Sequence, residues 1–175
     1  MKKQFFLLLA VLMGFAASAQ SSMKIGYADV DYIFSKLPEA KQIESQLQNH
    51  QVQLQNQLKA KYEEYQQKME IFNNMPADTD QAIQRAKMNE LARLEQDIQE
   101  FQQSAQESMD NKRRSLLDPV YTKVGNGIKA VAEQEGYDYV LTAGIAGTDI
   151  VLFANEKYDI SDLVLKNLGI NTGSN

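Results

Sequence analysis

The feature that most constrains the fold of this 175-residue chain is a pair of long helical runs separated by one turn. The first run starts at Pro38 and lasts to about Asn73, and the second extends from Thr79 to Asp118. Apolar side chains recur in both runs at steps of three and four residues, with a mean step of roughly 3.6 to 3.7. Because a strict heptad repeat would impose a left-handed supercoil, this spacing predicts nearly straight helices.

Each run carries one narrow apolar stripe on a surface rich in Gln, Glu and Lys. A long helix with a single stripe needs a partner, and the nearest partner is the other run. The segment FNNMPADTDQ (72–81) lies at the midpoint between Pro38 and Pro119, which predicts a hairpin with its tip near 73–80. We therefore expect residues 39–118 to form an antiparallel helical arm about 50–60 Å long. Its register would pair Leu47 with Met109, Leu54 with Phe101, Leu58 with Ile98, and Tyr65 with Leu91.

The segments on either side of the arm, 20–38 and 119–175, predict a small body that contains β-strands. A short alternating strand opens at Ile25 and Tyr27, and YDYVLT (137–142) is a second strand. IVLFA (150–154) is predicted to be a strand buried on both faces. The fold class is thus α+β, mainly α, with the arm projecting from the body.

The body also has two predicted helices. After Pro119 interrupts the arm, apolar residues from Val120 to Val131 share one helical face, and Gly136 is placed as a C-cap. Ser161 is placed to cap a last helix that stops at Gly169.

The N-terminus has the pattern of a secretory signal peptide. Two lysines follow Met1, and an apolar run from Phe5 to Ala17 leads into an Ala-Ser-Ala site. Such a run rises only about 20 Å as a helix, which is less than the ~30 Å of a bilayer's hydrocarbon core. We expect cleavage after Ala19, export to the periplasm and no transmembrane span in the mature chain. Without cysteine, the chain has neither a lipoprotein anchor nor disulfides.

The composition argues against catalysis, metal binding and nucleic-acid binding. The chain has no Cys and a single histidine, His50, which is expected to be an exposed residue of the arm. GIAGT (144–148) lacks the lysine of a phosphate-binding loop and is interpreted as a connection between strands. The net charge of −5 becomes −7 without Lys2 and Lys3, which disfavours a polyphosphate partner. We expect no enzyme, cofactor or metal.

The tip of the arm is the candidate binding surface. A two-helix arm has little interior, so part of its apolar surface stays accessible. Methionine is flexible and polarizable, which suits a surface that accepts many partners. The simpler alternative is that these residues only close the end of the hairpin. The candidates that lie beside the turn are Ile71, Phe72, Met75 and Met88.

Beyond these patterns, the chain resembles the OmpH/Skp family of periplasmic chaperones along essentially its whole mature length. The resemblance rests on KIGYADVDYIFSKLPEAK near the start, the long Gln-rich hairpin, LLDPVYTKVGNGIKAVAEQEGYDYVL and the closing YDISDLVLKNLG. It implies an ATP-independent holdase that binds unfolded outer-membrane β-barrel proteins and prevents their aggregation.

The resemblance also implies a homotrimer, in which strands of three subunits form the centre and three arms enclose a cavity. Residues implied for the body and trimer contacts are Ile25, Tyr27, Val140, Leu141, Val151, Leu152 and Phe153. Pro38 and Pro119 are candidate hinges that would let the arms splay to fit clients of different sizes.

The chain departs from the family in its charge. Well-known members have basic arms, whereas residues 39–118 here carry ten basic and fourteen acidic side chains. Attraction to lipopolysaccharide or anionic membranes is therefore not expected, and client binding should rest on apolar contacts. The alternative function is a structural or adaptor protein of the envelope whose arm docks one folded partner.

Overall fold

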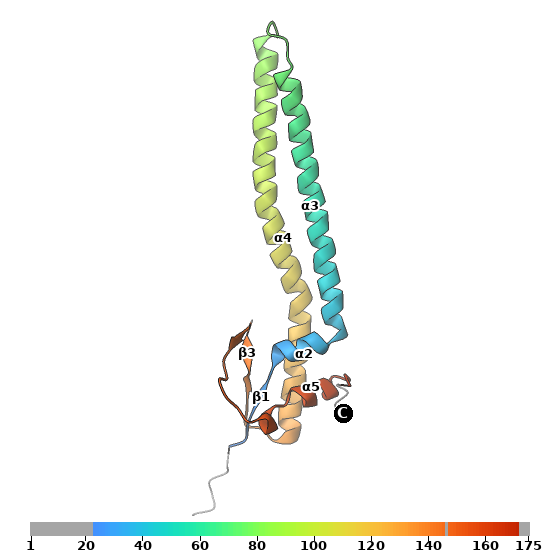
Figure 1. Cartoon of the computed structure of the whole chain (residues 1–175), viewed down its shortest axis with the longest axis vertical. Coiled ribbons are helices and arrows are strands. Elements are labelled where there is room, and N and C mark those ends of the chain that lie inside the picture. The colour runs from blue at the N-terminus through green and yellow to red at the C-terminus, as the bar shows by residue number, and fades with distance from the viewer. Residues whose placement is uncertain (1–22, 146, 172–175) are drawn as a thin grey trace, which may run out of the picture. The chain divides into compact units, whose positions relative to one another are not determined.

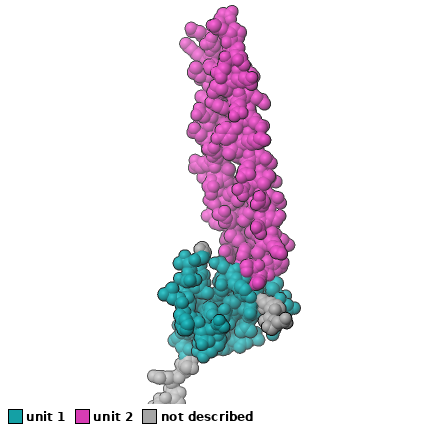
Figure 2. All heavy atoms as spheres, in the orientation of Figure 1, with its two compact units in different colours: residues 1–33, 124–175 teal, residues 34–123 magenta. Residues whose placement is uncertain are grey.

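The computed structural model describes residues 23–145 and 147–171, so the predicted signal peptide (1–19) lies outside the described residues. The chain is mainly helical with a small strand-containing body, as the sequence predicts. Two compact units are distinguished: a hairpin unit, residues 34–123, and a body unit made by residues up to 33 and from 124 onwards (Figure 2). The elements in order are β1 (Ile25–Ala28), α2 (Val30–Lys36), α3 (Pro38–Asn73), α4 (Gln81–Glu135), β2 (Tyr139–Thr142), β3 (Gly144–Ile145), β4 (Thr148–Asp149), the 3₁₀ helix η1 (Glu156–Tyr158) and α5 (Ser161–Asn167).

The hairpin unit consists of α3 and the first part of α4, which run antiparallel and are joined by a loop at 74–80 (Figure 1). Of its apolar stripe, Ile43, Leu91 and Ile98 are buried, whereas Leu54 and Leu58 are only half-buried. Two helices cannot surround a side chain on all sides, so most of the stripe keeps contact with solvent.

The contacts across the hairpin do not follow the pairs that the sequence predicts. His50 contacts Ser108, Lys68 contacts Glu90, and Tyr62 accepts a hydrogen bond from Gln102, whereas the predicted register pairs residues 50, 68 and 62 with residues 106, 88 and 94. The loop is closed by local hydrogen bonds, among them those from the Asn74 amide to the Glu70 carbonyl and from the Thr79 hydroxyl to the Pro76 carbonyl.

Two predicted helix boundaries are wrong. Pro119 does not interrupt the second run, because α4 continues through it to Glu135. Thr79 does not start α4 either. The Asp80 carboxylate accepts a hydrogen bond from the Ala82 amide at 2.6 Å, so the acidic residue supplies the N-terminal cap.

The body unit contains two small sheets, and the first is made of the strands that the sequence predicts at Ile25 and Tyr27 and within 137–142. β1 and β2 pair in parallel, with Ile25 beside Tyr139 and Tyr27 beside Leu141. β3 and β4 form a short antiparallel pair within the GIAGT region, which the sequence analysis interprets as a connection.

The predicted strand at 150–154 does not form. The amides of Ile150 and Val151 both donate to the Ala143 carbonyl, and the following residues lack a strand partner within the described chain. Leu152 and Phe153 are therefore 91% and 90% exposed, where burial on both faces was expected. An apolar composition cannot create a strand without a neighbouring backbone that pairs with it.

The core of the body unit is formed where α2, the end of α4 and α5 contribute apolar side chains. Its most buried members are Ile33, Val124, Ile160, Val164 and Leu165. Helix α4 ends as predicted at a glycine, since Gly136 has a φ of 69°.

Ser161 has a different role from the predicted cap. Its hydroxyl donates to the Asp159 carboxylate at 2.5 Å and accepts from the Asp29 amide at 2.9 Å. Asp159, one residue before the N-cap Ile160, also accepts from the Ser161 amide, so its carboxylate satisfies the first amide of α5. Helix α2, which the sequence analysis missed, starts where Asp29 accepts from the Tyr32 amide.

Candidate functional site

The hairpin tip presents apolar side chains to solvent. Ile71, near the end of α3, is 54% exposed, and Met88, on α4, is 57% exposed. Phe72 and Met75 are half-buried beside them in the chain. The four predicted tip residues thus divide into two that are accessible and two that partly pack into the end of the hairpin.

Ile83 is a tip residue that sequence reasoning missed. It lies in the first turn of α4 and is 53% exposed. The loop at 74–80 ends just before this turn. The sequence signal that could have identified Ile83 is its place within one helical turn of the predicted tip at 73–80.

Below the tip, an ion cluster connects the two helices. Glu90 on α4 accepts from Lys68 on α3 at 2.7 Å and from Lys87 at 2.9 Å. The hydrogen bonds from Lys68 and Lys87 lower the pKa of the Glu90 carboxyl to about 2. The hydrogen bond from Glu90 likewise raises the pKa of Lys68. All three side chains are about one-third exposed, so water screens the attraction between their charges. The ion cluster therefore adds little stability, and its main effect is to hold α3 and α4 in a fixed alignment.

The single histidine is not the exposed residue that was expected. His50 is half-buried, and its Nε2 lies 2.9 Å from the Ser108 hydroxyl across the hairpin. This contact is a polar link between α3 and α4, and it gives the imidazole ring a structural role.

The base of the hairpin unit places both predicted hinge residues near cross-helix contacts. Pro38 is the first residue of α3, and Pro119 lies inside α4. Lys123 donates to Glu39, and this hydrogen bond is the main cause that lowers the pKa of Glu39. The second carboxylate oxygen of Glu39 is buried and lacks a partner among the described atoms.

The body unit exposes one apolar face of its parallel sheet. Alternate residues of each strand point to the same side, so Ile25, Tyr27, Tyr139 and Leu141 share a face. Ile25 is 43% exposed and Leu141 is 49% exposed. Val140, another predicted body residue, lies on the opposite face and is half-buried.

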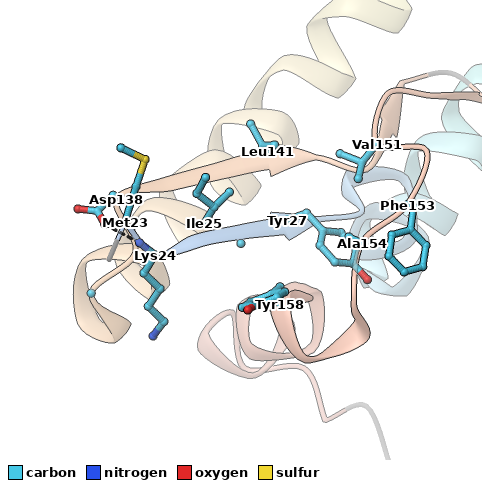
Figure 3. Close-up of a pocket in the computed structure, with 12 residues that line it drawn as sticks. Met23, Lys24, Ile25, Tyr27, Asp138, Leu141, Val151, Phe153, Ala154 and Tyr158 are labelled. Carbon is cyan, nitrogen blue, oxygen red and sulfur yellow. Dashed lines mark hydrogen bonds between the residues drawn. The ribbon is translucent and has the colours of Figure 1, made fainter. Parts of the chain in front are cut away.

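A groove of about 730 Å³ runs along this part of the body unit (Figure 3). Tyr27, Val151 and Phe153 lie toward one end of it, and Met23 and Asp138 lie toward the other. Partial burial and the neighbouring Asp159 carboxylate raise the pKa of the Tyr27 hydroxyl, which keeps the phenol neutral. Five of the seven predicted body residues line the groove, whereas Val140 and Leu152 do not. Leu152 is almost fully exposed.

Two kinds of feature are absent from the described part of the chain. Across residues 23–145 and 147–171, no group of three or more His, Cys, Asp or Glu is placed to hold a metal ion. Within the same ranges, no helix combines the length and the apolar character that crossing a bilayer requires.

Comparison with known proteins agrees with this architecture. Residues 24–168 match a family model described as outer membrane protein (OmpH-like). A protein named chaperone protein Skp from Pectobacterium atrosepticum is 31% identical over 163 residues, which cover 90% of this chain and 93% of that protein. The protein of the same name from Yersinia enterocolitica is 30% identical over 169 residues, covering 91% and 96%.

A solved structure shares the fold. The crystal structure of an OmpH-like outer membrane chaperone from Caulobacter crescentus superposes with a TM-score of 0.71 at 15% identity, covering 90% of this chain and 91% of that one. The family model spans nearly all of the described residues, and the relatives are similar over nine-tenths of the chain. The chain therefore belongs to the OmpH-like family.

Proposed function

We propose that the protein is an ATP-independent holdase that binds unfolded outer-membrane β-barrel proteins in the periplasm and prevents their aggregation. Family membership supports this function, as do relatives that are named chaperones. The lysines and apolar run of the first nineteen residues support export and cleavage after Ala19.

The single observation that carries the proposal is the exposed apolar tip on a long, thin hairpin. Ile71, Ile83 and Met88 each expose more than half of their surface. The helical turns around them carry acidic and basic residues side by side, without a block of one sign. Separate, weak apolar contacts retain an unfolded chain by multivalency and release it to a stronger acceptor without ATP. A site for one folded partner would instead use patterned charges.

The test is light scattering while an unfolded outer-membrane β-barrel protein is diluted from urea into increasing amounts of the mature protein. We expect aggregation to be suppressed and to saturate near three chains per client. A client that aggregates as it does alone, beside a folded protein, would favour the adaptor function instead.

The tip is tested by the double variant Ile71→Asp and Met88→Asp, which replaces both exposed apolar side chains with charges. The matched control is Gln67→Asp with Gln99→Asp, which adds the same charge at exposed polar positions of the same helices. The tip variant should need several-fold more protein for half-suppression, and the control should match the wild type. Equal activity of all three would assign the tip residues to hairpin closure alone.

A homotrimer built by the body unit is the second part of the proposal. An isolated pair of strands is marginally stable in water, and here the pair exposes the apolar face that includes Ile25 and Leu141. Leu152 and Phe153, almost fully exposed, supply further apolar area. In a trimer, neighbouring copies of the chain would cover this sheet face and the side chains of Leu152 and Phe153. The unpaired segment around 150–154 would gain a strand partner from a neighbouring subunit.

The oligomeric state is measured by multi-angle light scattering after size-exclusion chromatography. The wild type should have three times the mass of the mature chain. Leu152→Asp with Phe153→Asp should shift it towards the monomer, whereas Asn155→Asp, which adds charge nearby, should not. A monomeric wild type would refute the trimer without bearing on the tip.

A further inference from the structure

The hairpin unit contains a second apolar site, distinct from the tip, in a groove of about 360 Å³ between α3 and α4. Half-buried side chains of both helices line its floor, among them Leu54, Leu58, Phe101 and Met109. The groove lies in the middle of the hairpin, whereas the buried residues Ile43 and Leu91 close the stripe elsewhere.

The groove has a cause in the sequence. The apolar stripe of α3 is occupied at Gln51 by an amide, and that of α4 is occupied at Ala105 by a methyl group. Both residues line the groove, and neither gives an apolar side chain larger than a methyl group to cover the half-buried Leu54, Leu58, Phe101 and Met109 beside them. The apolar stripe is thus less covered here than at the buried residues Ile43, Leu91 and Ile98.

The rim of the groove is made of neutral amides. Gln51 and Gln55 contribute from α3, and Gln102 and Gln106 contribute from α4. A glutamine amide both donates and accepts hydrogen bonds, which matches the two groups of a peptide backbone. The Tyr62 hydroxyl holds Gln102 in place by accepting its hydrogen bond at 2.9 Å.

The charged residue that lines the groove is basic. Arg113 lines it, while the Lys61 ammonium lies 5.6 Å from the centre of the Phe101 ring, and no carboxylate lines it. Asp110 partly offsets the Arg113 charge at 3.5 Å. The surroundings therefore accept a neutral or acidic segment and disfavour one with lysine or arginine beside the bound side chain.

From these observations we infer that the groove holds one large apolar side chain of an extended, unfolded client segment, whose backbone lies on the glutamine rim. The inference rests on the proposed holdase function and gives it a second contact point on each hairpin. The volume is at the lower end of the range typical of ligand pockets, and it has room for one large apolar side chain together with part of the backbone beside it.

The site is tested by filling it from within. Ala105→Leu places an apolar side chain in the groove from α4. It should raise the melting temperature or leave it unchanged, because it covers apolar surface in the groove. The matched control is Ala92→Leu on the exposed side of α4, outside the groove. It adds the same atoms without filling the groove.

Binding is measured by fluorescence anisotropy with a labelled, urea-unfolded outer-membrane β-barrel protein. The variants are combined with Ile71→Asp and Met88→Asp, so that the tip does not mask the groove. We expect Ala105→Leu to weaken binding roughly five- to twentyfold, the loss of one buried apolar side chain. Ala92→Leu should bind like its parent.

A synthetic twelve-residue peptide of Ser, Thr and Gly with one central Phe provides an independent probe. Wild type should bind it more tightly than the peptide with Ala at the centre, and Ala105→Leu should abolish that difference. If the filled variant folds and binds both probes as well as its parent, the groove site is refuted while the holdase function stands. If the wild type binds neither probe and leaves aggregation unchanged, the holdase function itself fails.

Discussion

Ser161 shows how a single buried hydroxyl joins distant parts of the body unit. It is 2% exposed, accepts from the Asp29 amide at the start of α2, and donates to Asp159 at the start of α5. The hydrogen bond between the Asp29 amide and the Ser161 hydroxyl joins residues that are more than one hundred positions apart in the sequence. The hydroxyl therefore holds two helix starts at a fixed separation.

Replacing Ser161 with alanine should reduce the free energy of unfolding by about 1–3 kcal/mol, because the Asp29 amide loses its partner in a buried place. Urea denaturation followed by circular dichroism measures the change at a fixed chain concentration. Ser115→Ala is the control, since that hydroxyl is exposed and donates only to the Lys112 carbonyl of its own helix. A Ser161→Ala variant as stable as the control would contradict the role assigned to this residue.

Among elements, the hairpin should respond to acid through Glu90. The folded-state pKa of about 2 lies below the ordinary value of 4.5, so this carboxylate stabilises the fold above pH 4.5. The contribution is lost as the pH falls from 4.5 through 2, where the carboxyl becomes protonated in the folded state.

Glu90→Gln removes this titration. The difference in melting temperature between the wild type and the variant should therefore be largest near neutral pH and should vanish towards pH 2. Thermal unfolding across this range measures it, and Glu95→Gln, an exposed residue of the same helix, is the control. A difference that stays constant down to pH 2 would show that the ion cluster does not govern the response.

Helix α4 contains a built-in weak point at Pro119. Proline has no amide hydrogen to donate to the carbonyl four residues earlier, and its ring crowds that turn, at a cost of about 3 kcal/mol in a helix interior. Pro38 carries no such cost, because it lies in the first turn of α3, where the amide lacks a helical partner in any case. The two proposed hinges are thus physically different.

Pro119→Ala should increase the free energy of unfolding by roughly 1–3 kcal/mol, whereas Pro38→Ala should change it little. If Pro119 is a hinge, its replacement should also narrow the size range of unfolded clients that are kept soluble. The measurement is aggregation suppression for a small and a large β-barrel protein. A stabilised variant with an unchanged client range would contradict the hinge role, and the effect of Pro119 would then be limited to weakening the helix.

At the scale of the whole molecule, the charge balance sets the response to salt. The mature chain has a formal charge of −7, and its hairpin carries more acidic than basic side chains. Because apolar contacts are hardly screened, the dissociation constant for an unfolded client should change less than about threefold between 50 and 500 mM NaCl. Titration at both salt concentrations checks this, and a change of a hundredfold would indicate that charges dominate binding.

The sequence by itself determined the long-range plan of this protein. The 3.6-residue spacing of the apolar stripes fixed two long helices, and a single stripe on each required them to pair, since a helix cannot leave such a stripe uncovered. Gly136 marked a helix end because a φ of 69° favours glycine. These features depend on local periodicity and backbone conformation, which are properties of neighbouring residues.

Tertiary structure alone decided the rest. The contacts of His50 and Lys68 across the hairpin and the passage of α4 through Pro119 depend on packing that no local pattern encodes. IVLFA has the composition of a buried strand, yet Leu152 and Phe153 are exposed because a strand depends on a paired backbone as well as on apolar side chains. The mid-hairpin groove combines residues that are far apart in the sequence, since Leu54 of α3 and Ala105 of α4 line it together.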